Sequence, residues 1–202
     1  MTITQRSIYN MALANLGVSK KILDTSAPDK NREVLNVYWD IAIKQMLADF
    51  DWGFASNYRI LTPADNKPIN SKYNFAYDYP NDVLAPREIL NENGTYINNS
   101  NEKEKFQVVN YNGNAQIWCN IENAVLRYTK NITEVEKFSN EFVIGLSWLL
   151  AYFIAPAVVG SRTQHVDSYQ EYKEWCSNCQ TIDANKDNNY EDYVNEWIEA
   201  RG

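Results

Sequence analysis

Residues 142–161 read FVIGLSWLLAYFIAPAVVGS and carry no charged side chain over 20 positions. A stretch of this length is sufficient to cross a bilayer, and it is also typical of the central helix of a helical core. Gly145, Ser147 and Pro156 lower its helical strength, which membrane helices tolerate better than helices in water. Amphipathic helices elsewhere in the chain need an apolar partner. The sequence therefore favours a buried core helix, with a membrane-anchored protein using residues 142–161 as the alternative.

Two amphipathic helices are predicted ahead of this stretch. Thr2 and Gln5 form a capping-box pair at the start of the first helix, and Gly17 is its stop. The motif SAPD at residues 26–29 starts the second helix, with Asp in its first turn, and Gly53 ends it. Apolar residues recur along one face of the second helix at spacings of three and four: Leu35, Tyr38, Ala42, Met46 and Phe50.

Helices are predicted again after residue 132. Thr133 and Glu136 form a second capping box, and the uncharged helix follows to Val159. Residues 161–185 form the next helix. One stripe of that helix carries four residues at heptad-like spacing: Tyr169, Tyr172, Cys176 and Cys179.

The middle of the chain changes to the two-residue period of β-strands. Aromatic residues alternate at positions 73, 75, 77 and 79, and further short strands are predicted at 106–111, 116–120 and 124–129. Asn112-Gly113 is a strong hairpin signal, and Asn93-Gly94 predicts a turn between strands at 89–90 and 96–97. Of the 26 Asn residues, 16 lie between Asn57 and Asn131, so the Asn excess belongs to this loop-rich segment.

This order of elements predicts an α+β, mainly α fold with three parts. Residues 1–55 and 133–187 form an antiparallel helical bundle, residues 56–132 an inserted antiparallel β-rich segment, and residues 188–202 an extended C-terminal tail. The tail is too short to be a stable helix alone, so we expect it to dock on another subunit or protein. Its apolar face consists of Tyr190, Tyr193, Val194, Trp197 and Ile198.

The chain has 202 residues, a net charge of −7, one His and three Cys. This balance excludes a protein that grips the phosphate backbone of nucleic acids, because such binding depends on Lys and Arg. Cys176 and Cys179 fall inside a helical pattern, so we interpret them as helix-face cysteines; a redox pair, or a zinc site completed by Cys119 and His165, is the alternative. No Gly-rich phosphate loop is present. We expect no catalytic residue, no cofactor and no metal.

Two further expectations concern location and binding. The odd number of cysteines and the absence of a secretory signal at the start of the chain predict synthesis in a reducing cytoplasm. The aromatic strand with Tyr73, Phe75 and Tyr77 could present a stacking face to sugars, so a carbohydrate-binding module is another alternative. A half-buried strand of the insertion is the commoner arrangement.

Several short motifs follow one another in a recognisable order: ALANLGV at 12–18, YWD at 38–40, DWGFA at 51–55, YDYPND at 77–82, LRY at 126–128, and the pairs Leu150-Ala151 and Ile154-Ala155. In this order and spacing, over about residues 5–187, the chain resembles the tail tubular protein A family. Members of that family are the head-to-tail adaptors of short-tailed bacteriophages.

The resemblance implies a structural virion protein rather than an enzyme. Such adaptors form a ring, a dodecamer in this family, bound to the portal protein. The ring extends the DNA ejection channel and offers a platform for the tail nozzle and tail fibres. We therefore expect a protein of the virion neck, assembled in the host cytoplasm, through which genomic DNA passes without specific binding and which needs no membrane. An acidic channel would repel phosphate and keep the duplex mobile.

The resemblance also implies roles for matched positions. Trp52 and Phe54 would anchor the end of the second helix to the bundle core, and Tyr77, Pro80 and Asp82 would shape the strand-to-turn region. The C-terminal segment of such adaptors often reaches toward the portal. On this chain the corresponding docking residues would be those of the tail face already listed.

Overall fold

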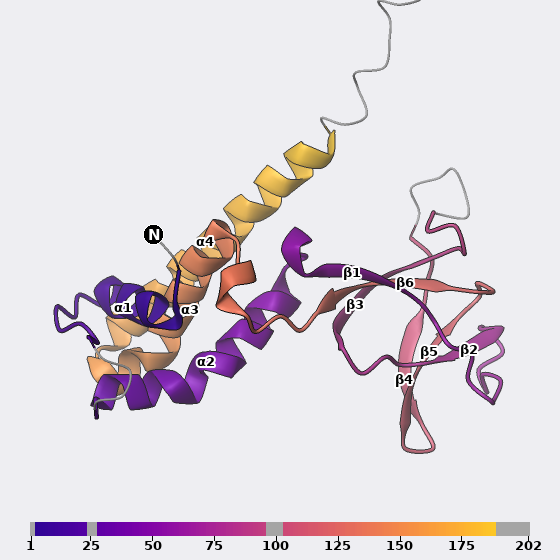
Figure 1. Cartoon of the computed structure of the whole chain (residues 1–202), viewed down its shortest axis with the longest axis horizontal. Helices are drawn as coiled ribbons and strands as arrows, with labels where there is room; N and C mark the ends of the chain where they lie inside the picture. The colour runs from indigo at the N-terminus through magenta and orange to yellow at the C-terminus, as the bar shows by residue number, and fades with distance from the viewer. Residues whose placement is uncertain (1–2, 24–27, 96–102, 189–202) are drawn as a thin grey trace, which may run out of the picture. The chain divides into compact units, whose positions relative to one another are not determined.

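The computed structural model describes residues 3–23, 28–95 and 103–188 (Figure 1). The fold is mixed, with four α-helices and two small antiparallel sheets in these ranges, and about 45% of the described residues are helical. The chain divides into two compact units: Met1–Met46 with Glu134–Gly202, the helical unit, and Leu47–Thr133, the inserted unit. The first border falls nine residues before the expected border at 55/56.

The first helix, α1 (Gln5–Asn15), has Thr4 as its N-cap. The Ser7 N–H donates to Thr4 Oγ1 at 3.2 Å and the Thr4 N–H donates to Ser7 Oγ at 2.9 Å, which completes a capping box. The predicted pair of Thr2 and Gln5 is therefore wrong. Thr2 and Thr4 are both residue types that favour the N-cap position, and the local sequence does not show which of them begins the helix.

The C-terminal end of α1 confirms Gly17 as the stop. Gly17 has a φ of +71°, in the left-handed region that favours glycine. The Val18 N–H donates to Leu13 O and the Gly17 N–H to Ala14 O, both at 2.9 Å. These two bonds define a Schellman motif, which satisfies carbonyl groups that the helix itself leaves unpaired.

The second helix, α2 (Lys30–Asp49), is capped by Asp29 rather than carrying Asp29 inside its first turn. Asp29 Oδ1 accepts from the N–H groups of Asn31 at 2.9 Å and Arg32 at 3.2 Å. The helix also ends four residues before Gly53, which instead begins a short 3-10 helix, Gly53–Ala55. Both predicted ends of this helix were therefore wrong by a few residues.

The uncharged stretch forms α3 (Asn140–Val158), with Ser139 as its N-cap. The predicted cap at Thr133 and Glu136 is wrong, because Val135–Lys137 forms a separate 3-10 helix. By length and composition α3 is the one helix of the described chain that could cross a membrane, with a mean hydropathy of 1.7, but 56% of that apolar window is buried inside the protein. This burial favours the core-helix interpretation.

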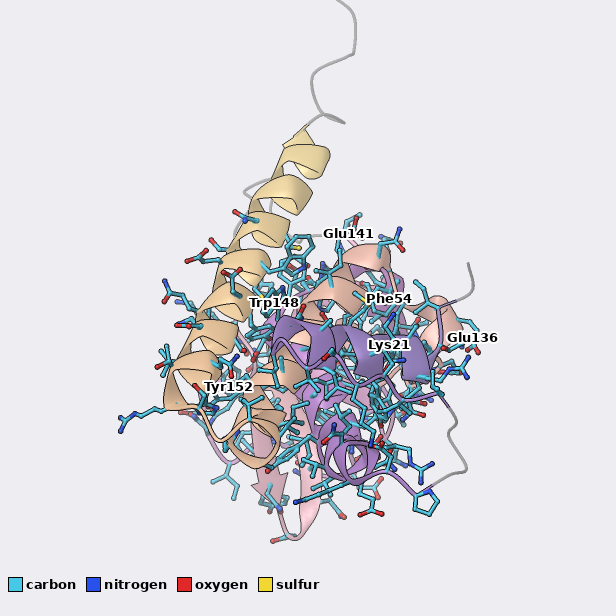
Figure 2. All side chains as sticks on the ribbon, turned by 90° about the vertical axis from the view of Figure 1, so that its left-hand side faces the viewer. Lys21, Phe54, Glu136, Glu141, Trp148 and Tyr152 are labelled. Atoms are coloured by element: carbon cyan, nitrogen blue, oxygen red, sulfur yellow. The ribbon has the colours of Figure 1, made fainter. Side chains whose placement is uncertain are left out.

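The other helices of the unit pack on α3 (Figure 1). The last helix, α4 (Arg162–Asn188), lies along it. Tyr152 of α3, labelled in Figure 2, stacks on His165 of α4 with ring centroids 4.3 Å apart. Gly145 allows close approach: a Cβ there would collide with Met46 of α2 and lie 2.9 Å from Trp175 Cδ1 of α4. On the predicted stripe of α4, Tyr172 and Cys179 are buried, whereas Tyr169 and Cys176 are partly exposed.

The inserted unit contains two three-stranded antiparallel sheets. One has the order β1-β6-β3, from Ser56–Ile60, Val125–Lys130 and Val83–Leu90; the other has the order β2-β5-β4, from Phe75–Asp78, Asn114–Cys119 and Gln107–Tyr111. Both sheets contribute to one apolar cluster that includes Tyr77, Ile117 and Leu126. Strand β1 was not predicted, and β3 begins six residues before the predicted residues 89–90.

The Asn-Gly hairpin prediction is confirmed. Tyr111 pairs with Asn114 across a two-residue turn, and Asn112 and Gly113 have φ values of 50° and 84°. Positive φ at both central residues is the requirement of the type I′ turn, which matches the twist of the flanking strands. At the second Asn-Gly pair Gly94 also has a positive φ of 72°; the strand predicted at 96–97 lies outside the described residues.

Candidate functional site in the inserted unit

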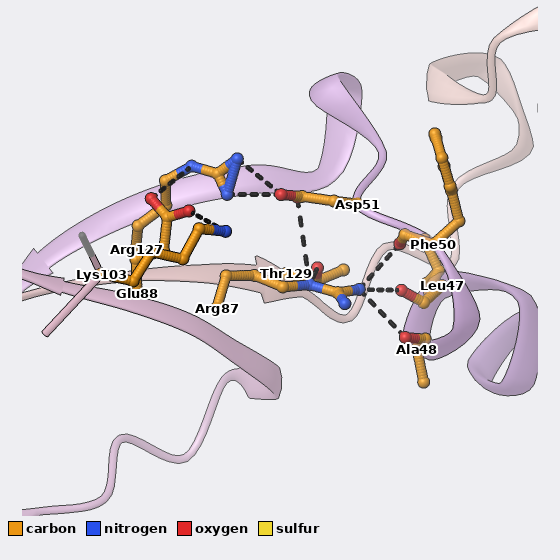
Figure 3. A network of polar contacts seen from close by, with 9 residues as sticks. All are labelled: Leu47, Ala48, Phe50, Asp51, Arg87, Glu88, Lys103, Arg127 and Thr129. Carbon is orange, nitrogen blue, oxygen red and sulfur yellow. Dashed lines mark hydrogen bonds and ion pairs between the residues drawn. The ribbon is translucent and has the colours of Figure 1, made fainter. Parts of the chain in front are cut away.

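Arg87, on β3, binds the main chain at the C-terminal end of α2 (Figure 3). Its Nη2 atom donates to the carbonyl oxygens of Leu47 at 2.8 Å, Ala48 at 3.1 Å and Phe50 at 2.7 Å. The last carbonyls of a helix have no partner within the helix, and a cation there also complements the helix dipole. This side chain from a distant strand explains why α2 ends before Gly53.

Asp51 lies between two guanidinium groups. Both Nη atoms of Arg127, on β6, donate to Asp51 Oδ2 in short bonds. Asp51 Oδ1 is buried and accepts no hydrogen bond from the described chain, and it forms an ion pair of 3.9 Å with Arg87 Nε. Arg87 Nε donates instead to Thr129 Oγ1 at 2.8 Å. The carboxylate therefore links strands β3 and β6 to the segment after α2.

Glu88 extends this network on the other side of Arg127. Its side chain is 8% exposed; Lys103 Nζ lies 2.6 Å from Oε1, and Arg127 Nε lies 3.9 Å from Oε2. Burial opposes the charged form of Arg127, but Asp51 and Glu88 outweigh it and raise the pKa of Arg127. For Arg87, burial outweighs the attraction of Asp51 and lowers its pKa, although an arginine remains charged in proteins.

Asp82 forms a second polar cluster at the start of β3. Its Oδ1 accepts from Arg59 Nη1 at 2.9 Å and its Oδ2 accepts from the Tyr128 hydroxyl at 2.9 Å. Burial alone would raise the pKa of Asp82, but the Tyr128 hydrogen bond and the charges of Arg59 and Lys130 lower it. Pro80 O accepts the N–H of residue 83 at 3.3 Å, and Pro80 and Asp82 lie in the connection between β2 and β3.

Tyr77 is a core residue of the inserted unit. Its side chain is 2% exposed, and its hydroxyl donates to Ile121 O at 2.7 Å. Tyr73 is also buried, and the ring of Phe75 packs against that of Tyr77 with centroids 6.5 Å apart. Two of the three rings expected to stack on sugars are therefore covered by protein, and the carbohydrate-binding alternative has no open aromatic face in this strand.

Trp52 and Phe54 follow α2 and lie in the inserted unit. Trp52 is buried, Phe50 meets it edge-on with ring centroids 4.6 Å apart, and Phe54 lies 6.2 Å from it. The three rings form an aromatic cluster on the segment that carries Asp51. The resemblance implied that Trp52 and Phe54 anchor the end of this helix to the bundle core. The Phe50–Trp52 and Trp52–Phe54 contacts lie at the C-terminal end of α2.

A cavity of about 460 Å³ lies beside the Asp82 turn. Its lining is polar and charged at most positions: Arg59, Ile60, Thr62, Asp78, Tyr79, Pro80, Asn81 and Asp82. Within the described ranges no group of three or more His, Cys, Asp or Glu side chains could hold a metal ion, and the three cysteines are free thiols. The ionic groups of the site pair with one another, and Arg87 fixes the main chain at the end of α2.

The predicted tail face, from Tyr190 to Ile198, lies outside the described residues. Sequence reasoning also missed the residues that organise the inserted unit: Arg87, Glu88 and Arg127 with Asp51. One signal was available, because Arg127 stands inside the apolar strand sequence AVLRYT and a charge in such a strand needs a partner. The sequence did not reveal which partner it has.

Comparison with known proteins does not name a family. No family model matches the sequence, and no curated protein is significantly similar to it.

Proposed function

We propose that this protein is a structural virion protein, the head-to-tail adaptor of a short-tailed bacteriophage. The observation that carries the proposal is the organisation of the chain. Both ends of the sequence contribute to one helical unit, and an antiparallel β unit is inserted between them. The motifs that resemble tail tubular protein A are distributed over both units in the order that this organisation requires.

The exposed apolar side chains support assembly into a ring. Val37 and Ile41 on α2 and Val166 on α4 are exposed in the helical unit, and Tyr58, Ile60 and Ile69 are exposed in the inserted unit. A closed ring uses two different surfaces of each subunit, and Val37 and Ile41, four residues apart, lie on the same face of α2. Both units therefore offer side chains suited to a contact between subunits.

The charge balance suits a conduit for DNA. Each subunit has a net charge of −7, and repetition around a ring gives an acidic wall that repels phosphate. The duplex would pass without being held, since tight backbone binding needs many Lys and Arg contacts. The tail at residues 188–202 would dock the subunit on the portal or on a neighbouring subunit.

The proposal is tested by sizing the full chain with light scattering, alone and with the portal protein, and by imaging the product. We expect closed rings of one size, bound to portal. Replacing Tyr193 and Trp197 together by Ala should lower ring docking and leave the circular dichroism spectrum unchanged. A chain that stays monomeric and does not bind portal would contradict the proposal.

A further inference from the structure

The Schellman end of α1 forms the floor of a pocket in the helical unit. The pocket has a volume of about 350 Å³, and Leu13, Ala14, Gly17 and Val18 contribute to its lining. The segment that follows folds back on α1, because the Asn10 side chain accepts from the Ile22 N–H at 2.8 Å and donates to Ile22 O at 3.1 Å. The Asn10 side chain thereby fixes the main chain of Ile22 beside α1, directly after the lining residues Ser19, Lys20 and Lys21.

Two lysines stand at the rim of this apolar pocket. Lys20 is 75% exposed and pairs with Asp29 at 3.1 Å. Lys21 is exposed on the surface of the unit (Figure 2) and forms no ion pair with another described residue. An apolar floor with a positive rim suits a segment that combines large apolar side chains with carboxylates.

The chain itself contains a segment of this chemistry. Residues 189–202 read NYEDYVNEWIEARG, with four acidic residues and one Arg. Trp197 and Ile198 stand together, with Glu196 before them and Glu199 after them. We propose that residues 189–202 of a second copy of this chain dock in the α1 pocket. Trp197 and Ile198 enter the apolar floor, and the flanking carboxylates face the lysines of the rim.

The dimensions of α4 indicate why the docked segment comes from a second copy. Gln164, in the first turn of α4, donates from Nε2 to Leu16 O at 3.1 Å, so this end of α4 lies beside the pocket. The 24 residues from Gln164 to Asn188 place the other end of α4 about 36 Å away. Figure 1 shows that far end on the opposite side of the helical unit from the segment after α1.

To reach the pocket of its own chain, the tail would have to run back from Asn188 along the length of α4. The nine residues from Asn188 to Trp197 span at most about 32 Å when fully extended. Some of that length is used in reversing direction at the helix end. Docking in the same chain would need a fully extended tail running back along about 36 Å of helix, whereas a neighbouring copy can present its tail directly. This inference rests on the proposed self-assembly, and it names the receptor surface for the tail.

Photo-crosslinking of the full chain tests the docking. A benzophenone amino acid is placed at Ala14, which is an exposed lining residue. We expect covalent dimers in which mass spectrometry maps the cross-link to residues 189–202. Mixing 15N-labelled and unlabelled copies shows whether the link joins two chains. The same probe at the exposed Lys44 of α2 is the control. Cross-links confined to one chain, or to another segment, would overturn the proposal.

A charge exchange supplies a second readout. Lys21→Glu should weaken self-association about 5- to 10-fold, as should Glu196→Lys with Glu199→Lys, and combining them should restore it. Lys44→Glu is the matched control. If interchain cross-links form at Ala14 but the protein does not bind portal, the docking proposal is supported and the adaptor function is contradicted. If rings bind portal but no such cross-links form, the adaptor function is supported and the docking proposal is overturned.

Discussion

The two units of the protein satisfy their buried polar groups in different ways. In the helical unit Ser147 and Ser168 are buried, and each hydroxyl donates to a carbonyl of its own helix at 2.7 Å. In the inserted unit the buried Glu88 and Thr129 bind side chains from other elements. A helix pairs its own main chain, so its buried face can be almost wholly apolar. Small sheets and irregular connections depend on contacts between distant segments.

This difference predicts where single substitutions cost most. In the inserted unit a charge removed from the network leaves its partners buried and uncompensated. In the helical unit the corresponding damage comes from altered packing.

Replacing Arg87 by Ala should lower the free energy of unfolding by about 2–4 kcal/mol, because three carbonyl groups at the end of α2 and the Thr129 hydroxyl lose their donor. Asp51 keeps its bonds to Arg127. Denaturant titration measures the change. Arg59→Ala is the control, since its side chain is 53% exposed and surface ion pairs contribute less than about 1 kcal/mol. If Arg87→Ala and Arg59→Ala lowered the free energy of unfolding equally, the Arg87 contacts would contribute no more than a surface ion pair.

Replacing Gly145 by Ala should destabilise the helical unit by about 1–3 kcal/mol, because the added Cβ collides with Met46 and crowds Trp175. Thermal unfolding followed by circular dichroism measures the loss. Gly53→Ala is the control: it has an ordinary φ, and nothing lies within 4 Å of the added Cβ. A Gly145→Ala protein as stable as the parent would mean that α3 is loosely packed.

Replacing Tyr77 by Phe should cost about 1–2 kcal/mol, since Ile121 O loses its buried donor. Tyr9 of the helical unit is the matched comparison. Its hydroxyl donates to Asn36 Oδ1 at 2.8 Å, and burial raises its pKa to about 12. Tyr9 is as buried as Tyr77, but its partner Asn36 is exposed, so water can replace the bond at Asn36 and Tyr9→Phe should cost less. The reverse order in equilibrium unfolding would contradict the assignment of Tyr77 to a dry core.

Asp82 should give a small dependence of stability on pH. Its pKa is lowered in the folded protein despite burial, through Tyr128, Arg59 and Lys130. The stabilisation is therefore complete above the ordinary pKa of aspartate, about 3.9, and is lost as pH falls through the lower folded value. Asp82→Asn should be less stable than the parent at pH 6. Unfolding measured from pH 6 to pH 3 should show the gap closing, and a constant gap would exclude this ionic origin.

Much of the local structure could be predicted from neighbouring residues. Gly17 and the Asn112-Gly113 pair have positive φ, and few residues other than Gly and Asn adopt it without strain. The uncharged run predicted the existence of α3 and its C-terminal end to within one residue, but the predicted start at Thr133 was seven residues early. Helix starts were less certain, because any nearby Ser, Thr or Asp can cap a helix; Thr4, Asp29 and Ser139 were the ones used.

The charged network could not be predicted in the same way. Asp51 and Arg127 are 76 residues apart, and Arg87 is 37 to 40 residues from the carbonyl groups it binds. Only residues 89–90 of strand β3 were predicted, because Pro86, Arg87 and Glu88 interrupt the alternation of apolar and polar residues before them. The partners of Arg87 and Glu88 lie on β6, at the end of α2 and at Lys103, all far away in the sequence.

Local sequence patterns predicted the four helices, the Asn112-Gly113 hairpin and the β-rich insertion between the two pairs of helices. They could do so because periodicity, glycine and capping residues act over a few positions. The tertiary structure decided where α2 ends, which carboxylate joins Arg87 to Arg127, and which end of α1 carries a pocket. These depend on contacts between segments far apart in the chain, whose energies arise only after folding has brought the groups together and removed water from between them.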